Sequence, residues 1–359
     1  MEAVQRGTGE GEDQGGLVKT QKTAKTRMEP APGTPRIEVH GRREARDVIQ
    51  RSGPYDAVIV VTPVPPAEGG LLATGALPGA WKAIERLAES DKAVSSGEAS
   101  TVLVPTDGLA GGRLVLASTG RLDRITDDVR RFAEAGEAGM RKAVKAGASR
   151  PLIVVDGPAG DERYARAAEA ALMGALGSMW RSVEARIAKP GDASRVKAVG
   201  LIAGGDGIAD RARRAAALEE GRAIARDIGG TQAGIMTPEA AASYVEAAFG
   251  RGPVKVSVER SIPAIGREYP LLMAVARGSL VADRLHPRVV RLEYDPPGGK
   301  AGRTVVLVGK GVTYDTGGHD LKVGGGMSGM SRDKCGAAAV AGIMKVASML
   351  RPAGVTASL

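Results

Sequence analysis

The sequence predicts an α/β protein built of two successive α/β units. Short apolar runs that end at Gly, Pro or Asp alternate with stretches of helix length from Ile37 onward, which is typical of parallel or mixed sheets with helices between the strands. The 359 residues, of which 43% are hydrophobic, suffice for two ordinary cores. The apolar runs fall short of the roughly 18 residues that cross a bilayer, so we expect a globular, cytoplasmic protein.

The first predicted unit follows a polar N-terminal segment. Residues 1–35 are rich in Gly, Lys, Thr and Pro and lack periodicity, so we expect a disordered tail. Residues 36–205 are expected to form an N-terminal α/β domain. Its strands are predicted at 56–63, 100–105, 112–118, 150–157 and 197–205. Its helices are predicted at 80–90, 127–147 and 161–187.

The second predicted unit comprises residues 206–359. An amphipathic helix is expected over 210–230, and another over 237–250, where Thr237 is the N-cap and Pro238 occupies the first helical position. The remaining predicted elements are strands at 254–259, 271–278, 287–295 and 303–311 and a helix of small residues at 336–350. The last strand leads into a Gly-rich connection.

The net charge raises the question of nucleic-acid binding. The chain carries a formal charge of +9, but its basic residues alternate with acids along the predicted helices, and aromatic residues make up only 3%. Since single-strand binding combines cations with stacking aromatic side chains, a solvated surface is the favoured interpretation. Nucleic acid is therefore a weakly supported partner.

Several isolated residues receive structural interpretations. His40 and His286 stand alone in the sequence, so we expect surface or hydrogen-bonded structural histidines. Trp81 and Trp180 fall on predicted helical faces and are expected in the core. Cys335 is the single cysteine, which excludes a disulfide framework and a cysteine-based zinc cluster, and it is expected to be a small packed residue. A metal would need His, carboxylate or lysine ligands.

The most informative stretch is VGKGVTYDTGGHDLKVGGGMSGMSRDKCGAAA, residues 308–339. It concentrates Lys310, Asp315, Lys322 and Asp333 between a predicted strand and helix, where open α/β sheets place their sites. Phosphate binding is disfavoured, because the Walker spacing is missing and aspartates repel anions. A metal site would use the two aspartates, and a lysine only with a neutral amine. Loop charges that are merely solvated are the third interpretation.

This stretch resembles the core signature of the leucyl aminopeptidases, also called cytosol aminopeptidases. Lys310, Asp315, Lys322 and Asp333 fall at the family's relative spacing, and the two methionines of the stretch match as well. The segments ALEEGRAIARDIGGTQAGIMTPEAAA and HPRVVRLEYDP also look like the opening of its catalytic domain. The resemblance covers residues 210–359. It implies a macro-domain-like N-terminal domain, an α/β catalytic domain with a mixed central sheet, and hexameric assembly.

The resemblance also implies a chemistry. Members are dinuclear Zn²⁺ or Mn²⁺ exopeptidases that release N-terminal, leucine-like residues from peptides. By resemblance, Lys310, Asp315 and Asp333 are metal ligands, with Asp315 shared between two ions. Lys322 is the catalytic lysine, which polarises the scissile carbonyl and stabilises the oxyanion. The metals acidify a bridging water to make the nucleophile.

The sequence departs from the family pattern in two respects. The remaining family ligands come from a downstream Asn-Thr-Asp-Ala-Glu-Gly-Arg segment, but this sequence contains no Asn and stops at Leu359, so we expect only the first half of the site. His319 and Asp320 replace a small or apolar pair and are candidate substitute ligands, while Lys334 and Cys335 replace Met and Gly. The alternative is a non-catalytic paralogue or fragment that associates with protein or nucleic acid. Nucleotide or ADP-ribose binding by the N-terminal domain rests on fold analogy alone.

Overall fold

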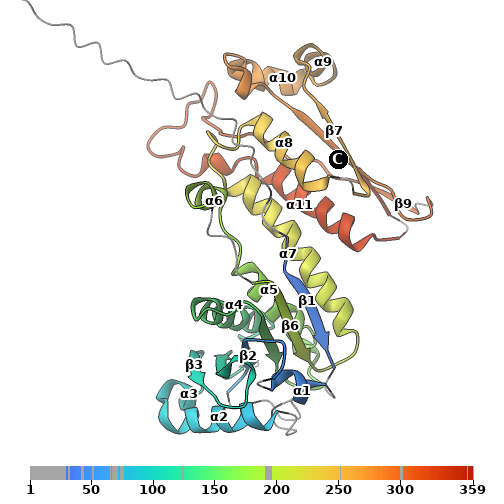
Figure 1. The fold of residues 1–359 in the computed structure, drawn as a ribbon. Coiled ribbons are helices and arrows are strands. Elements are labelled where there is room, and N and C mark those ends of the chain that lie inside the picture. Colours follow the sequence, from blue (N-terminus) through green and yellow to red (C-terminus); the bar gives the residue numbers. More distant parts are fainter. Residues whose placement is uncertain are drawn as a thin grey trace, which may run out of the picture.

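The computed structural model describes most of the chain after the N-terminal tail. The described residues are 30, 33–41, 44–50, 52–64, 66, 72, 77–122, 125–190, 196–250, 252–299, 302–353 and 355–358. The tail predicted to be disordered lies outside them, apart from 30 and 33–35. Two lobes are present, each with its own sheet, and the long helix α7 (Ile208–Gly230) runs from the N-terminal lobe into the C-terminal lobe (Figure 1).

The N-terminal lobe contains a six-stranded sheet of order β1-β6-β5-β2-β4-β3. Its strands are β1 (Arg36–His40), β2 (Ala57–Thr62), β3 (Thr101–Pro105), β4 (Arg113–Ser118), β5 (Pro151–Val155) and β6 (Ala198–Ala203). Neighbouring strands are parallel except for β3 and β4. Every residue of β2, β5 and β6 is buried, as expected for continuous apolar strands covered on both faces. The predicted α/β class is confirmed, and β1 adds an edge strand that the apolar runs did not predict.

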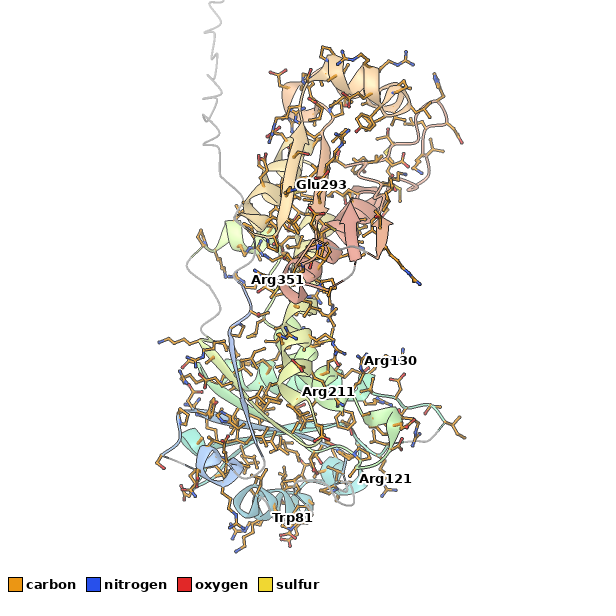
Figure 2. The ribbon with its side chains drawn as sticks, turned by 90° about the vertical axis from the view of Figure 1, so that its right-hand side faces the viewer. Trp81, Arg121, Arg130, Arg211, Glu293 and Arg351 are labelled. Atoms are coloured by element: carbon orange, nitrogen blue, oxygen red, sulfur yellow. The ribbon has the colours of Figure 1, made fainter. Side chains whose placement is uncertain are left out.

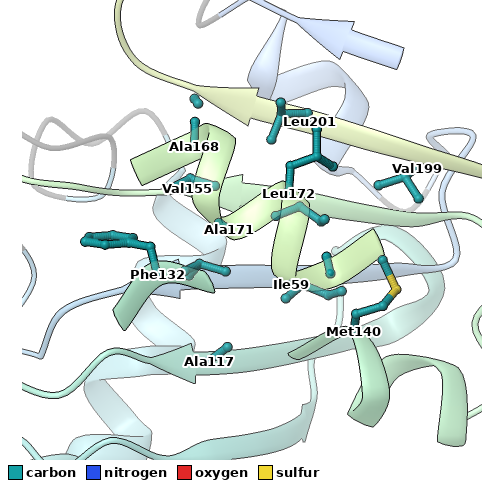
Figure 3. Packing of buried hydrophobic residues seen from close by; sticks show 14 of the residues in the cluster. Ile59, Ala117, Phe132, Met140, Val155, Ala168, Ala171, Leu172, Val199 and Leu201 are labelled. Atoms are coloured by element: carbon teal, nitrogen blue, oxygen red, sulfur yellow. The ribbon is translucent and has the colours of Figure 1, made fainter. Parts of the chain in front are cut away.

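Helices cover both faces of this sheet. They are α1 (Ala45–Ile49), α2 (Pro78–Ser90), α3 (Lys92–Ser96), α4 (Arg130–Lys145) and α5 (Ala167–Gly177). The next helix, α6 (Val183–Ala188), instead contacts α7 through the ion pair of Arg186 with Asp227. Successive residues of β2 face opposite sides, so Ile59 packs with Phe132 and Leu172 of α4 and α5, while Val60 packs with Ile84 of α2. Figure 3 shows the first of these clusters around Ile59. The sheet is therefore the shared wall of two apolar cores.

The segment 161–187, predicted as one helix, forms three pieces. A 3-10 turn, η2 (Glu162–Tyr164), precedes α5, and α6 follows after a break. The hydroxyl of Ser182 caps the N-terminus of α6. Between the two helices, the Trp180 indole donates a 2.8 Å hydrogen bond to Asp227 of α7. Contacts with α7 and a new N-cap therefore override the continuous helical pattern.

The C-terminal lobe contains a mixed sheet of order β7-β8-β10-β9. Its elements are α8 (Pro238–Phe249), β7 (Val254–Glu259), α9 (Ile262–Glu268), α10 (Pro270–Ala276), η3 (Arg277–Ser279), η4 (Asp283–Leu285), β8 (Val289–Tyr294), β9 (Arg303–Val306), η5 (Met330–Arg332), α11 (Cys335–Leu350) and β10 (Val355–Ser358). Only β9 and β10 pair in parallel; the other neighbours are antiparallel. Thr237 caps α8 through the amide of Ala240 and Pro238 begins the helix, as predicted.

One predicted strand of this lobe is wrong, and another is shorter than predicted. Residues 271–278 form helix α10 and the 3-10 turn η3. Pro270 stands at the first helical position, and a short apolar run is compatible with either a helix or a strand. Of the predicted strand 303–311, only Arg303–Val306 is extended in the sheet. Lys310 therefore lies in the following loop, four residues beyond the strand end.

Helices α7 and α11 pack closely in antiparallel directions. A Cβ atom on Gly221 would lie 2.6 Å from the Gly342 carbonyl oxygen, and the reverse holds for Gly342 and the Gly221 oxygen. Nearer the end of α7, Gly229 faces Cys335 and Ala338. The absence of side chains at these glycines lets the two backbones touch. This contact carries the start of α11 to the end of α7.

Charged side chains are spread over both lobes. In Figure 2, Arg121 and Arg211 lie on the N-terminal lobe, whereas Glu293 and Arg351 lie on the C-terminal lobe.

Among the described residues, none of the helices combines the length and apolar character that a membrane span requires.

Candidate active site

The Gly-rich connection is fixed to the first turn of α11. The backbone amide of Ala337 donates a 2.8 Å hydrogen bond to the Lys310 carbonyl. A Cβ atom on Gly309 would lie 2.5 Å from the Ala337 Cα, and one on Gly336 would lie 2.9 Å from the Lys310 nitrogen. Because neither glycine has a Cβ atom, the loop backbone can approach the helix directly. This contact sets the position of Lys310.

The turn η5 brings the two aspartates of the connection together. The carbonyl of Met330 accepts hydrogen bonds from the amide of Asp315, at 3.4 Å, and from the amide of Asp333, at 3.2 Å. Seventeen residues separate these aspartates in the sequence, yet one carbonyl oxygen links their backbones. Their relative position therefore depends on the geometry of a single 3-10 turn.

Each aspartate is paired with one of the two lysines. The Lys310 Nζ lies 2.6 Å from Asp333 Oδ2, and the Lys322 Nζ lies 3.5 Å from Asp315 Oδ2. The other carboxylate oxygen of Asp315 accepts a 2.8 Å hydrogen bond from the Gly317 amide. That backbone hydrogen bond, and then the charge of Lys322, lower the pKa of Asp315. The Asp333 hydrogen bond raises the pKa of Lys310. The structure thus brings together all four polar residues named from the sequence.

The carboxylates suit a divalent cation, but the set of donors is small. Asp315 and Asp333 are the hard oxygen donors that Mg²⁺, Mn²⁺ and Zn²⁺ accept. Within the described residues, no group of three or more His, Cys, Asp or Glu side chains is arranged to hold a metal ion. His319 and Asp320 are exposed on the same loop, and they do not complete such a group with the aspartates.

The comparison with known proteins assigns this region to a family. Residues 223–359 match the catalytic domain of the cytosol aminopeptidase family. This region of the chain belongs to that family. It is 36% identical to a putative aminopeptidase of Caenorhabditis elegans, over 72% of this chain and 49% of that protein. It is 32% identical to a probable cytosol aminopeptidase of Azoarcus sp., over 80% of this chain and 59% of that protein. The chain therefore spans about half of the length of these relatives.

Two solved structures share its fold. A tomato leucine aminopeptidase mutant gives a TM-score of 0.64 at 18% identity. The match covers 92% of this chain and 63% of the tomato chain. The bottromycin maturation enzyme BotP, in complex with Mn, gives a TM-score of 0.62 at 24% identity. The match covers 84% of this chain and 58% of the BotP chain. The alignment with the tomato enzyme extends over both lobes of this chain, since it includes 92% of its residues.

A buried lysine beside the site escaped the sequence analysis. Lys334 follows Asp333 and is only 2% exposed. Its Nζ donates a 2.7 Å hydrogen bond to the Thr231 carbonyl and another to the Ser331 carbonyl, and burial lowers the pKa of its ammonium group. The sequence showed only that Lys334 departs from the family pattern. Its burial depends on the packing of α11 against α7.

Cys335 differs in part from its prediction. It is exposed, although its Sγ lies 3.9 Å from the Gly229 carbonyl oxygen. The predicted small packed residue therefore contacts α7 on one side only. Its position at the first turn of α11 leaves the other side open to solvent.

Asp227 is a second buried residue that the sequence did not reveal. It is fully buried at the C-terminal end of α7. Its carboxylate accepts hydrogen bonds from Trp180, from Arg186 at 2.6 Å and from the Tyr244 hydroxyl at 2.7 Å. Trp180, predicted in the core, is half-buried in this polar network instead. The network joins α6, α7 and α8 just behind the site.

The other isolated residues lie away from the four-residue cluster. The His40 ring nitrogen and the Tyr55 hydroxyl are 2.5 Å apart, and His286 contacts the Leu280 carbonyl at 3.3 Å. Both histidines are hydrogen-bonded structural residues, as predicted. Trp81 of α2 packs, partly buried, against the second core of the N-terminal lobe.

Proposed function

We propose that this chain contributes to a metal-dependent aminopeptidase that releases leucine-like N-terminal residues from peptides. The observation that carries the proposal is the convergence of Lys310, Asp315, Lys322 and Asp333 on one loop, inside the region that matches the family's catalytic domain. A merely solvated loop would not pair each aspartate with a lysine and link both aspartate backbones to one carbonyl.

Asp315 and Asp333 are the side chains that would hold a divalent ion. When bound, the ion would supply an acidified water as the nucleophile. We propose two ions, Zn²⁺ or Mn²⁺, and Mn²⁺ is the first to test because BotP is known in complex with Mn. Lys310 could join as a ligand only after losing its proton, and the Asp333 carboxylate opposes that loss by raising its pKa. The carboxylates are therefore the primary donors.

Lys322 is proposed as the catalytic residue. Its ammonium group lies beside Asp315 on a flexible side chain, and about one third of it is exposed. A positive charge held beside Asp315 can stabilise the oxyanion that develops on the scissile carbonyl. Lys322 would thus act on the substrate, and the aspartates would act on the ion.

The organisation of the whole protein follows from the family. We propose that residues 36–205 form the macro-domain-like domain and that residues 206–359 belong to the catalytic domain. A sheet of mixed direction lies in the second region, in support of this division. Hexameric assembly and a cytoplasmic location are proposed from family membership alone.

The deciding experiment measures ion binding and hydrolysis separately. Mn²⁺ binding to the purified chain is followed by electron paramagnetic resonance of the free ion, and hydrolysis is followed with leucine p-nitroanilide. We expect Asp315→Asn and Asp333→Asn to weaken Mn²⁺ binding at least about tenfold, or ~1.4 kcal/mol. We expect Lys322→Met to retain Mn²⁺ binding and lose hydrolysis.

Asp320→Asn is the matched control, because Asp320 is an exposed carboxylate on the same loop. It should leave Mn²⁺ binding unchanged. The proposal is wrong if the wild-type chain binds no Mn²⁺, or if the control weakens binding as much as Asp315→Asn does. Mn²⁺ bound to a chain that hydrolyses no peptide analogue would support the ion site and refute the activity.

A further inference from the structure

The buried Lys334 ammonium connects two parts of the chain that are far apart in the sequence. One acceptor is the carbonyl of Thr231, the C-cap residue of α7. The other is the carbonyl of Ser331, which lies inside η5. Within the described part of the chain, no carboxylate lies within ion-pairing distance of Lys334. Carbonyls at a helix C-terminus carry partial negative charge and favour a cation. The end of α7 is thus a suitable receptor for this ammonium group.

The turn that Lys334 holds is the one to which the backbone amides of both aspartates are hydrogen-bonded. Ser331 is the residue after Met330, whose carbonyl accepts the amides of Asp315 and Asp333. The rest of the connection has few anchors, since most residues from 311 to 329 are exposed. A displacement of η5 would therefore move both carboxylates, whereas the start of the loop at Lys310 is held independently by Ala337.

We propose that Lys334 is a positioning residue for the two-aspartate site. Its ammonium group fixes η5 to the end of α7 and so sets the separation of Asp315 and Asp333. Removing the ammonium group leaves the Thr231 and Ser331 carbonyls without their donor, and buried carbonyls without donors are costly. We then expect η5 to move away from α7, so that these carbonyls can accept hydrogen bonds from water. The role in ion binding rests on the proposed function; the tether itself does not.

The test uses the full chain and two measurements. Hydrogen exchange of the metal-free protein reports on the amides of Asp315 and Asp333, because both depend on Met330. Mn²⁺ affinity, measured by electron paramagnetic resonance, reports on the carboxylates. We expect Lys334→Met to accelerate exchange of these two amides at least about tenfold and to weaken Mn²⁺ binding at least about tenfold. Lys334→Arg keeps a cation with several donors and should restore part of both.

Val340→Ala is the matched control for a general loss of stability. Val340 is buried in the same helix and belongs to the core of the C-terminal lobe, away from the turn. It should lower the melting temperature without changing either measurement. The inference is overturned if Lys334→Met and Val340→Ala have the same effect, or if Lys334→Met leaves exchange of the two amides unchanged.

The outcomes separate this inference from the proposed function. Faster exchange in Lys334→Met, in a protein whose wild type binds no Mn²⁺, would establish the tether and refute the metal site. Mn²⁺ binding that is equal in wild type and Lys334→Met would support the metal site and refute the positioning role. If Lys334→Met does not fold, Lys334→Gln, which retains an N–H donor, replaces it in both measurements.

Discussion

Glu239 offers a quantitative test of how the C-terminal lobe is held together. It lies in the first turn of α8. Its carboxylate accepts hydrogen bonds from Arg288 at 2.6 Å, from Arg260 at 3.2 Å and from Ser243 at 3.1 Å. Burial alone would raise its pKa, but the two arginines outweigh burial and lower the pKa from 4.5 to about 2. The charged carboxylate therefore stabilises the contact of α8 with Arg260, which follows β7, and with Arg288, which precedes β8.

The size and sign of this contribution follow from the pKa. A change from 4.5 to about 2 corresponds to ~3.4 kcal/mol at about 1.36 kcal/mol per pKa unit. Since 37% of the side chain is exposed, solvent screening reduces the expected value to ~1–2 kcal/mol. Because the folded-state pKa is lowered, the stabilisation is complete above pH 4.5 and is lost as the pH falls from there towards 2.

The assay is urea unfolding of wild type and Glu239→Gln, followed by circular dichroism. We expect Glu239→Gln to lower the free energy of unfolding by ~1–2 kcal/mol at pH 7, with the difference shrinking as the pH approaches 2. Asp210→Asn is the control, because Asp210 also lies in the first turn of a helix but is 74% exposed and pairs with the exposed Arg213. It should cost less than about 0.5 kcal/mol. A Glu239→Gln loss that is the same at pH 7 and pH 2 would refute the reasoning.

Four further substitutions, one of them a control, test the site and the packing of the two lobes. Gly309→Ala should displace the loop, since its Cβ atom would lie 2.5 Å from the Ala337 Cα, and should weaken Mn²⁺ binding measured by paramagnetic resonance at least about tenfold. Gly311→Ala, whose Cβ atom would lie 3.4 Å from the Ala337 side chain, should leave binding within about twofold; equal effects would contradict this. Asp227→Asn breaks a buried pair and should cost ~3 kcal/mol in urea unfolding, and a loss below about 1 kcal/mol would argue against it. Gly174→Ala should lower the melting temperature and cost ~1–3 kcal/mol, because its Cβ atom would lie 1.9 Å from a backbone oxygen of α4; an unchanged melting temperature would be the contrary result.

The N-terminal sheet could be predicted because its strands are buried on both faces. Continuous apolar runs such as residues 57–62, AVIVVT, are short and rich in β-branched residues, which favours a strand over a helix. Residues 36–40 escaped because their strand lies at the sheet edge and is only half-buried. Residues 271–278 were mistaken because an apolar run on an exposed helix carries no helical period of its own. Their helical state depends on Pro270 at the first helical position.

The four residues of the candidate site could be predicted from the sequence, but the buried lysine that holds η5 in place could not. Lys310, Asp315, Lys322 and Asp333 stand at spacings that resemble a known family, so the sequence named them without any geometry. Their roles stay proposals until ion binding is measured. The burial of Lys334 could not be predicted, because it depends on a contact with a carbonyl 103 residues earlier. No local pattern carries information about such a contact.

The position of the site follows from the register of two helices. Gly221 of α7 faces Gly342 of α11, and the helices run in opposite directions. From this contact, α7 continues ten residues to Thr231, about 15 Å at 1.5 Å per residue, and α11 extends back eight residues to Lys334, about 12 Å. The remaining few ångströms are within reach of a lysine side chain. The glycine contact therefore sets where Lys334 meets the end of α7. Lys334 in turn sets the position of η5, to which the amides of both aspartates are hydrogen-bonded. Small residues in the middle of two helices and a charge at their ends thus act on the same site.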